Sequence, residues 1–404
     1  MAPAAGPHLA MYLGASQIAS RERLFLDAGA ALAAEGWRVT FLTAKPIPAL
    51  RAAVTSPMRL VDVGRIGPFP MPRLLPHLAR LYASTPAVAG FLREARPDVL
   101  MGTSIPPNLI MLQARRMAKL DAPVILRQSN VVPIAADPAS RHAARRLRDR
   151  LMPRLYPDAA AVIGVSEGVA HNLLAAGWLP PDRIHAIPNG VDLAAAEAQA
   201  AAPVDHPWLQ GDGGGPVIVA VGRLIVKKDY PTLLRAFAGL EGERPARLIV
   251  LGEGRERPKL EALVKQLGLE GRVDLFGRTP NPFAFLARAD LFVLSSRFEG
   301  MPSVVIEALA CGCPAVSTDC PSGPSEILGG GAYGPLTPVG DVEALRGAMI
   351  ERLAAPRDAE RLKARAAEFS AARTVSRYAD LIKSLAPAPA GQVIPDIAPS
   401  PARP

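Results

Sequence analysis

The sequence has few cysteines, three in 404 residues, and Cys311, Cys313 and Cys320 all fall within one short stretch. Three thiols cannot complete a disulfide framework, and no second ligand cluster accompanies them to indicate a zinc site. They are expected to be small packing residues in a reducing compartment. Long apolar runs are also missing, because none approaches the ~20 residues that span a bilayer.

A signal peptide is not recognisable either. Residues Met1 to Pro7 lack a basic region and a hydrophobic core, so we expect a cytoplasmic protein. Hydrophobic residues make up 49% of the chain and occur in short runs, which is typical of a globular protein. The length of 404 residues allows two sizeable domains, each with its own core.

Positive charge is in excess, and it is concentrated in the first half of the chain. Residues 1–200 hold 22 Lys and Arg against 14 Asp and Glu, whereas the remainder holds 24 against 23. Much of the excess lies in one stripe, Arg141, Arg145, Arg146, Arg148, Arg150 and Arg154. Such a stripe suits an anionic membrane surface or a phosphorylated acceptor, each cation adding ~1 kcal/mol near anionic lipid. A solvated charged helix explains it equally well. No nucleic-acid partner is expected, because no aromatic residues interleave with the arginines.

Short apolar runs alternate with helical patterns along the whole chain, which predicts an α/β fold of doubly wound parallel sheets. The expected strands are residues 8–13, 38–43, 98–102, 123–127, 160–165, 184–187, 216–222, 247–252, 273–277, 291–294 and 314–317. The expected helices are residues 20–36, 78–96, 168–176, 230–240, 258–267, 281–289, 302–312, 341–353 and 359–385.

Composition places the boundaries between the parts. Residues 1–192 form a first Rossmann-like domain, and residues 216–370 form a second. The segment 193–215 between them is Ala-rich and then Gly-rich, as in a linker or loop. Residues 371–385 are expected as a separate final helix. The tail 386–404 is rich in Ala and Pro and is expected to be disordered.

The most informative stretch is residues 289–328. An apolar strand at Leu291–Leu294 runs into a polar turn, and Pro302 opens a helix that ends near Gly312. The turn lies at the carboxyl end of a parallel strand, where open α/β sheets bind ligands. Two carboxylates stand there, Glu299 and Glu307, with seven residues between them.

These features indicate a ligand with two kinds of group. Free N–H groups at a helix start favour an anion such as a diphosphate, whereas carboxylates hold hydroxyls. A nucleotide bearing a sugar carries both. For an isolated pair, however, a Glu299 that complements the helix dipole and a solvated Glu307 would be the better interpretation.

A second candidate segment joins the strand at 216–222 to the next helix. Arg223 and Lys228 stand at opposite ends of this loop, and two cations there could neutralise a diphosphate. Taken alone, two solvated surface cations would be the simpler interpretation. The pair of carboxylates roughly seventy residues later reverses that preference.

Together these segments resemble glycosyltransferase family 4. The E-x7-E pair is followed by small residues, a strand and Glu326-Ile327-Leu328, and Gly222, Arg223, Leu224 and Lys228 match the family's G-R-L-x3-K pattern. Asp229 stands where the family usually has glycine, and Lys227 is expected to be a spare cation. The family's first loop carries paired glycines, of which Gly14 is matched and the second is Ala15.

The resemblance implies the GT-B fold, in which two doubly wound Rossmann-like domains face each other across a cleft. Residues 1–192 would bind the acceptor and residues 216–370 the nucleotide sugar, with the helix 371–385 returning to the first domain. It implies a retaining transfer from a UDP-hexose or UDP-N-acetylhexosamine to a hydroxyl of a glycan or lipid-linked acceptor, in cell-surface polysaccharide synthesis. No D-x-D occurs, so no metal is expected. Peripheral contact with the inner face of the cytoplasmic membrane is an open alternative.

Residue roles follow from the same resemblance. Arg223 and Lys228 would hold the diphosphate, and Glu299 would lie beside the transferred sugar, so these three form the expected catalytic set. The expected donor-binding set is Glu307, which would hold the ribose, with Gly222, Arg278, Gly300, Met301, Ser303, Val304 and Gly14. The alternatives are a nucleotide-sugar epimerase or phosphorylase of the same fold, and a non-catalytic nucleotide-sugar-binding protein.

Overall fold

The structure is a computed structural model that describes residues 6–14, 20–44, 46–66, 82–132, 143–210, 214–240, 242 and 245–387. These residues do not include Ala15, Arg141, the proline-rich residues 70–76 or the expected tail from residue 388 onward. The side chains of Arg145 and Arg146 are likewise not described. The membrane-binding interpretation of the basic stripe therefore stays a prediction.

Two sheets organise the chain, and both have the strand order of a doubly wound fold. The first has seven strands in the order β3-β2-β1-β4-β5-β6-β7, and the second has six in the order β10-β9-β8-β11-β12-β13. All neighbouring pairs of the six-stranded sheet run parallel. The predicted doubly wound α/β class is thus confirmed.

The seven-stranded sheet is built from short, buried strands. They are β1 His8–Tyr12, β2 Arg38–Thr43, β3 Arg59–Asp62, β4 Val99–Gly102, β5 Val124–Gln128, β6 Ala161–Gly164 and β7 Ile184–Ala186. The connecting helices are α1 Ser20–Ala34, α2 Pro48–Ala53, α3 Val63–Ile66, α5 Thr85–Ala95, α6 Ile105–Ala118, α7 Ala143–Leu155 and α8 Glu167–Ala176, with 3-10 turns η1 Tyr156–Asp158 and η2 Pro181–Arg183. Helices α5 and α6 pack against each other, and α6 covers β4.

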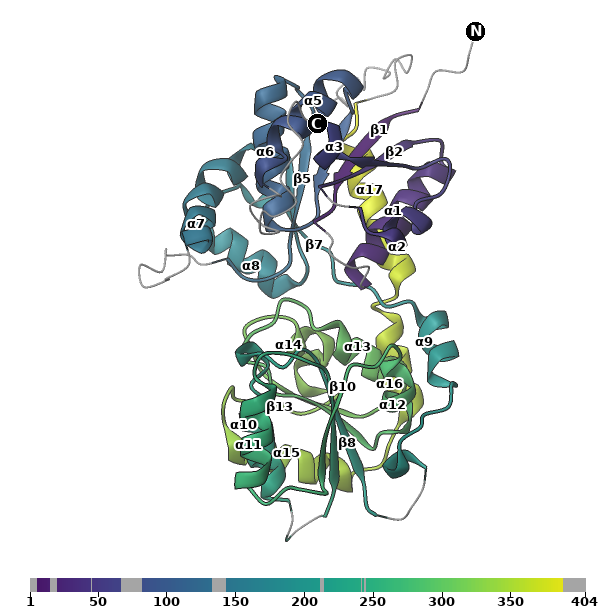
Figure 1. Ribbon diagram of the computed structural model, residues 1–404, viewed down its shortest axis with the longest axis vertical. Helices are drawn as coiled ribbons and strands as arrows, with labels where there is room; N and C mark the ends of the chain where they lie inside the picture. The colour runs from purple at the N-terminus through teal and green to yellow at the C-terminus, as the bar shows by residue number, and fades with distance from the viewer. Residues whose placement is uncertain are drawn as a thin grey trace, which may run out of the picture. The chain divides into compact units, whose positions relative to one another are not determined.

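The six-stranded sheet consists of β8 Val217–Val221, β9 Arg247–Leu251, β10 Val273–Gly277, β11 Leu291–Leu294, β12 Ala315–Thr318 and β13 Leu336–Thr337. Its helices are α10 Tyr230–Ala238, α11 Arg257–Gln266, α12 Pro282–Arg288, α13 Ser303–Ala310, α14 Pro324–Ile327, α15 Val342–Ala354 and α16 Ala359–Ala367, with 3-10 turns η4 Val226–Lys228 and η5 Gly329–Gly331. Helices α10, α11 and α15 lie on one side of the sheet, and α12, α13 and α16 lie on the other (Figure 1).

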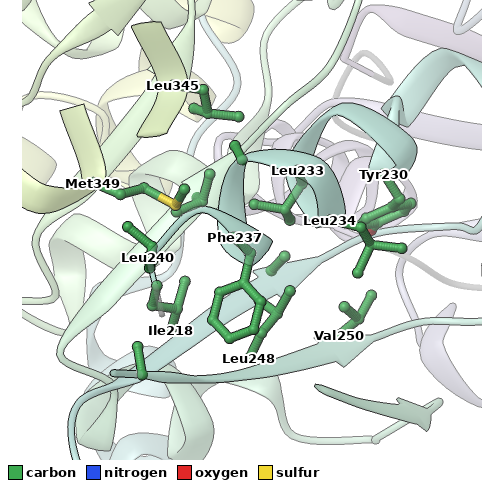
Figure 2. Close-up of a cluster of buried hydrophobic side chains, with 14 of the residues drawn as sticks. Ile218, Tyr230, Leu233, Leu234, Phe237, Leu240, Leu248, Val250, Leu345 and Met349 are labelled. Carbon is green, nitrogen blue, oxygen red and sulfur yellow. The ribbon is translucent and has the colours of Figure 1, made fainter. Parts of the chain in front are cut away.

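One face of this sheet carries a large apolar cluster (Figure 2). Phe237 of α10 points down toward Ile218 of β8 and Leu248 of β9, and all three side chains are fully buried. Leu345 and Met349 bring α15 into the same cluster. Each such side chain contributes roughly 1.5–3 kcal/mol by leaving water. This packing fixes α10, and with it the loop that precedes α10.

Two predicted boundaries differ from the structure. The expected loop at 193–215 contains α9 Leu193–Ala200 and η3 Pro207–Leu209, because its alanines favour helix and Asp192 caps α9 by accepting a hydrogen bond from the N–H of Ala195 at 3.0 Å. The single helix expected at 359–385 is broken into α16 and α17 Ala371–Leu385. Ser370, between them, forms a parallel bridge with Val191.

Contacts divide the chain into two compact units, one within residues 1–17, 29–125 and 379–404 and the other within 18–28 and 126–378. The second unit contains the whole six-stranded sheet. In the first unit, Lys383 of α17 donates to the Glu35 carboxylate beyond α1 at 2.7 Å. No helix in the described part of the chain is both long and apolar enough to cross a membrane.

Candidate active site

The loop that follows β11 carries Glu299, and residues from the end of β12 hold it in place. The Thr318 hydroxyl donates to the backbone carbonyl of Ser296 at 2.6 Å. The Ser322 hydroxyl donates to the carbonyl of Glu299 at 2.6 Å. Because these hydroxyls are buried, the two bonds satisfy loop carbonyls that no strand partner reaches. The loop that carries Glu299 is thus tied to the last residue of β12 and to the turn that follows β12.

The Glu299 carboxylate lies at the centre of a charged cluster. Lys228 Nζ is 2.8 Å from its Oε1 atom, and Lys227 Nζ is 2.8 Å from its Oε2 atom. The Ser296 hydroxyl also donates to Oε1, at 2.9 Å. Burial alone would raise the pKa of Glu299, but the charges of Lys228 and Lys227 outweigh it and hold that pKa below its ordinary value. The carboxylate is therefore ionised at neutral pH.

Lys227, the expected spare cation, also lies in this cluster. Its side chain is only 22% exposed and pairs with the same carboxylate as Lys228. The short turn η4 places the two lysines in succession, and their long stems reach different oxygens of Glu299. The family pattern marks only the second lysine, so the sequence contained no signal for this pairing.

Asp229 occupies the position where the family usually has glycine, and its backbone adopts a conformation that glycine favours. Its backbone has φ 48°, in the left-handed region that glycine favours and aspartate tolerates. Its carboxylate is 3% exposed and lies 3.0 Å from Arg297 Nε, with Arg297 Nη2 at 3.3 Å from the other oxygen. The Thr232 hydroxyl donates to it at 3.0 Å. The Asp229–Arg297 pair therefore ties the lysine loop to the loop of Glu299.

Gly222 makes room for Lys228. A Cβ atom at this position would lie 2.9 Å from Lys228 Cε and 3.2 Å from the hydroxyl of Tyr230. That hydroxyl donates to the carbonyl of Gly222 at 2.9 Å. Arg223, the next residue, is exposed and makes no ion pair with any described residue. The structure thus places the Lys228 ammonium on Glu299 and leaves the Arg223 side chain at the surface.

Glu307 projects from α13 and is the other half of the carboxylate pair. It is half-buried and makes no hydrogen bond or ion pair within the described part of the chain. Burial raises its pKa to about 7, against a smaller lowering by the charge of Lys228. It lines a cavity of about 450 Å³, together with Phe283 of α12 and Gln199 of α9. An acceptor without a partner therefore faces open space.

The start of α13 offers hydrogen-bond donors. The N–H groups of Ser303 and Val304 have no hydrogen-bond partner among the described residues. Such donors at a helix start attract anions. Just before them, the carbonyl of Met301 accepts a hydrogen bond from Asn189 Nδ2 at 3.2 Å. At Gly300 an added Cβ would lie 1.9 Å from the carbonyl oxygen of Ser129, so only glycine fits.

Two predicted donor-binding residues are not brought to the Glu299 cluster by any described contact. Arg278 is exposed beyond β10, where its charge is one of the smaller influences that lower the pKa of Glu253, after the hydrogen bond from Arg257. Gly14 belongs to the first compact unit, and an added Cβ there would lie 3.0 Å from the ring of Pro107 at the start of α6. Close packing already accounts for that glycine.

The three cysteines are free and buried, which confirms the prediction that they are packing residues. Burial raises the pKa of Cys311 to about 12 and that of Cys320 to about 11. Thiols with such pKa values stay protonated and unreactive at neutral pH.

Sequence reasoning missed most of the residues that support Glu299, namely Ser296, Thr318, Ser322 and Arg297. The signal for three of them was present, since hydroxyl residues stand at or just after the carboxyl ends of β11 and β12, where a loop needs hydrogen-bond donors. Arg297 carried no such signal, because its partner Asp229 lies 68 residues earlier in the chain. The cluster as built presents an ionised carboxylate, two ammonium groups and free N–H donors.

Two family models match the chain, one in each half. The model described as Glycosyltransferase Family 4 matches residues 22–195. The model described as Glycosyl transferases group 1 matches residues 206–369, which include Lys228, Glu299 and Glu307.

Curated relatives match parts of the chain. It is 34% identical over 189 residues to an N-acetylgalactosamine-N,N'-diacetylbacillosaminyl-diphospho-undecaprenol 4-alpha-N-acetylgalactosaminyltransferase of Campylobacter jejuni, covering 47% of this chain and 49% of that protein. It is 29% identical over 268 residues to the lipopolysaccharide core biosynthesis glycosyltransferase LpsE of Rhizobium meliloti, covering 65% of this chain and 74% of that protein. The first match thus spans about half of the relative's length.

Solved structures match nearly the whole chain. The match to a crystal structure of Anabaena HepE in complex with UDP covers 94% of this chain and 100% of that one, with 19% sequence identity and a TM-score of 0.70. WaaG, a glycosyltransferase involved in lipopolysaccharide biosynthesis, is 18% identical, with a TM-score of 0.68 over 93% and 99% of the two chains. At these identities the likeness concerns the fold.

Proposed function

Because the chain belongs to glycosyltransferase family 4 and has its GT-B fold, we propose that it transfers a sugar from a nucleotide donor to a hydroxyl group of a glycan or lipid-linked acceptor. The observation that carries the proposal is the contact of Lys228 with Glu299, together with Glu307, which lines a cavity and whose pKa the charge of Lys228 lowers against burial. Cations beside hydroxyl-binding carboxylates suit a donor that holds a diphosphate and a sugar.

The cations would act on the leaving group. When the bond between the sugar and the diphosphate breaks, negative charge develops on the diphosphate, and fixed cations that meet it lower the barrier. We assign this work to Lys228 and to Arg223, whose exposed side chain is available to a ligand. The N–H groups of Ser303 and Val304 would bind phosphate oxygens at the start of α13.

The carboxylates would act on hydroxyls. Glu307 would accept hydrogen bonds from the ribose, consistent with its place at the cavity. Glu299 would lie beside the transferred sugar, where its charge holds hydroxyls or steadies positive charge at the anomeric carbon. Gly222, Gly300 and Met301 would shape the site through the close backbone approaches described above. We extend the donor-binding assignment to Arg278 and Gly14 from the family pattern alone.

The donor and acceptor are proposed more specifically from the relatives. UDP is the favoured nucleotide, since the HepE structure holds UDP. A hexose or N-acetylhexosamine is the favoured sugar, because the Campylobacter relative is named as an N-acetylgalactosaminyltransferase. That relative's name includes a diphospho-undecaprenol, which favours a lipid-linked acceptor in cell-surface polysaccharide synthesis. We further propose retention of anomeric configuration, independence from metal ions, and peripheral contact of the basic residues 141–154 with anionic membrane.

A two-stage experiment tests the function. UDP-, GDP- and ADP-sugars are first screened for protection against thermal unfolding, since a ligand at 100 times its Kd stabilises the folded state by about 2.7 kcal/mol. The stabilising donor is then incubated with and without lipid-linked glycan acceptors, and released nucleotide and products are measured. Transfer that requires the acceptor supports the proposal. Nucleotide release from donor alone would identify an epimerase, and binding without turnover would identify a non-catalytic binding protein.

A further inference from the structure

Two ammonium groups share one carboxylate at the centre of the site. Lys227 and Lys228 each lie 2.8 Å from Glu299, on different oxygens, so the three side chains together carry one net positive charge. A single lysine would be enough to neutralise Glu299. The second cation therefore needs an explanation that the family pattern does not supply.

The two lysines have different surroundings. The stem of Lys228 passes Gly222, and its charge lowers the pKa of Glu307 against the larger effect of burial. The Lys227 ammonium instead lies 3.4 Å from Asn130 Oδ1 and 5.4 Å from the centre of the Phe298 ring. Amide and aromatic partners of this kind stabilise a cation without neutralising it.

Glu299 needs a cation at all times. Its side chain is 9% exposed, and an ionised carboxylate that loses its only counter-charge in a buried site is strongly destabilised. If Lys228 were the sole partner, its movement to an incoming diphosphate would leave that charge uncompensated. The carboxylate would then take up a proton or leave its position.

We propose that Lys227 is a positioning residue that keeps Glu299 ionised and in place while Lys228 transfers its contact to the donor diphosphate. The inference rests on the proposed function for the identity of that anion. The pairing of Lys227 with Glu299 is a property of the unliganded protein and can be measured without any donor.

The backbone around Lys227 is built to hold this geometry. The N–H of Arg297 donates to the carbonyl of Lys227 at 2.9 Å, and the Ser295 hydroxyl donates to the carbonyl of Lys228 at 2.9 Å. The Asp229–Arg297 ion pair closes the same two loops one residue further on. Three contacts between the lysine loop and the Glu299 loop therefore fix where the Lys227 side chain starts.

The test compares Lys227→Met, Lys227→Arg and Lys228→Met with a matched control, Lys259→Met. Lys259 of α11 is exposed and pairs with Glu256, the residue that precedes α11, and neither residue contacts the cluster through any described ion pair or hydrogen bond. Three quantities are measured for each protein: the titration of the Glu299 carboxyl by carbon-13 NMR, assigned with Glu299→Gln, the Kd for UDP by calorimetry, and kcat with the donor found in the screen. Circular dichroism and Tm report folding.

The titration is interpretable because the charged and titratable neighbours of Glu299 are known. Lys227 and Lys228 face it from η4, Tyr230 from α10 and Cys320 from beyond β12. Burial, with a smaller contribution from Glu299 itself, raises the pKa values of Tyr230 and Cys320, so both stay neutral over the range in which a carboxyl titrates. Among the described residues named here, the two lysines are therefore the ones that add charge to this titration.

We expect Lys227→Met to raise the pKa of Glu299 and to lower kcat at least tenfold, while the Kd for UDP changes less than threefold. Lys228→Met should weaken UDP binding at least tenfold, and Lys227→Arg should restore the pKa of Glu299 to its wild-type value. An equal loss of UDP affinity in Lys227→Met and Lys228→Met would make Lys227 a diphosphate ligand and overturn the proposal. An unchanged pKa of Glu299 in Lys227→Met would also overturn it. If wild-type protein binds neither UDP nor any nucleotide sugar, the proposed function is refuted instead. The effect of Lys227 on the Glu299 titration is measured without donor, so that result does not depend on the proposed function.

Discussion

Replacing Glu307 by glutamine should stabilise the protein above neutral pH and weaken donor binding. The pKa of Glu307 is raised from 4.5 to about 7 in the folded protein. Between these values the folded state binds a proton that the unfolded state has released, so the free energy of unfolding falls as pH rises through this window. At 1.36 kcal/mol for each pH unit the full loss would be about 3 kcal/mol.

The expected effect is smaller than that limit. Glu307 is half-buried and borders open space, so water screens part of the penalty, and we expect about 1–2 kcal/mol of stabilisation by Glu307→Gln at pH 8. At pH 4.5 and below, the two proteins should have similar stability, because the native carboxyl is then protonated and resembles the amide. The same change removes a charged acceptor from the cavity, so the affinity for the donor should fall about tenfold.

Urea unfolding at pH 4.5 and pH 8 measures the first effect, and calorimetry with the stabilising nucleotide sugar measures the second. Glu360→Gln is the control, since that carboxylate is 86% exposed on α16 and should change neither quantity. Equal destabilisation by Glu307→Gln at both pH values would refute the reasoning, because it would mean that Glu307 is ionised and partnered in the folded protein. Unchanged donor affinity would remove Glu307 from the binding site.

Two further substitutions test the loops that hold the cluster. Asp229→Ala should lower the free energy of unfolding by about 2–3 kcal/mol, because alanine is strained at φ 48° and loses the bonds to Arg297 and Thr232. Asp229→Gly loses the same bonds but relieves the strain, so it should cost about 1 kcal/mol less. Urea unfolding compares the two variants, and equal losses would contradict the left-handed backbone at this position. Gly300→Ala should lower Tm and should lower kcat at least tenfold, since its Cβ would overlap the carbonyl of Ser129. The control Gly347→Ala, at an open helical position, should stabilise the protein by about 0.5–1 kcal/mol. A Gly300→Ala protein with normal Tm and activity would show that the backbones of Gly300 and Ser129 are not in contact.

The parts of the fold that were predictable are those set by local pattern. Buried strands such as β8 and β11 read as short apolar runs, and their alternation with helices determines a doubly wound sheet. The turn after β11 and the start of α13 at Ser303 were also predictable, because Pro302 can only precede or open a helix there. Lys228 and Glu299 were recognisable as candidates through family spacing.

The remaining features depend on contacts between distant residues. The break between α16 and α17 follows from the bridge of Ser370 to Val191, which no helical pattern near residue 370 reveals. The left-handed Asp229 is stabilised by Arg297, 68 residues away. Lys227 could not be distinguished from a solvated lysine until its distance to Glu299 was known. Electrostatic partners are set by tertiary structure, so sequence identifies the charges but not their pairing.

The central claim is that the lysine–glutamate cluster binds an activated sugar donor through its diphosphate. Calorimetric titration of the stabilising nucleotide sugar into wild-type protein and Lys228→Ala tests this most directly. A charge-assisted hydrogen bond contributes about 1.5–3 kcal/mol, so the account predicts measurable binding to wild type and a Kd roughly ten to a hundred times weaker for the variant. Equal affinity of the two folded proteins, or no binding of any nucleotide sugar to wild type, would contradict it.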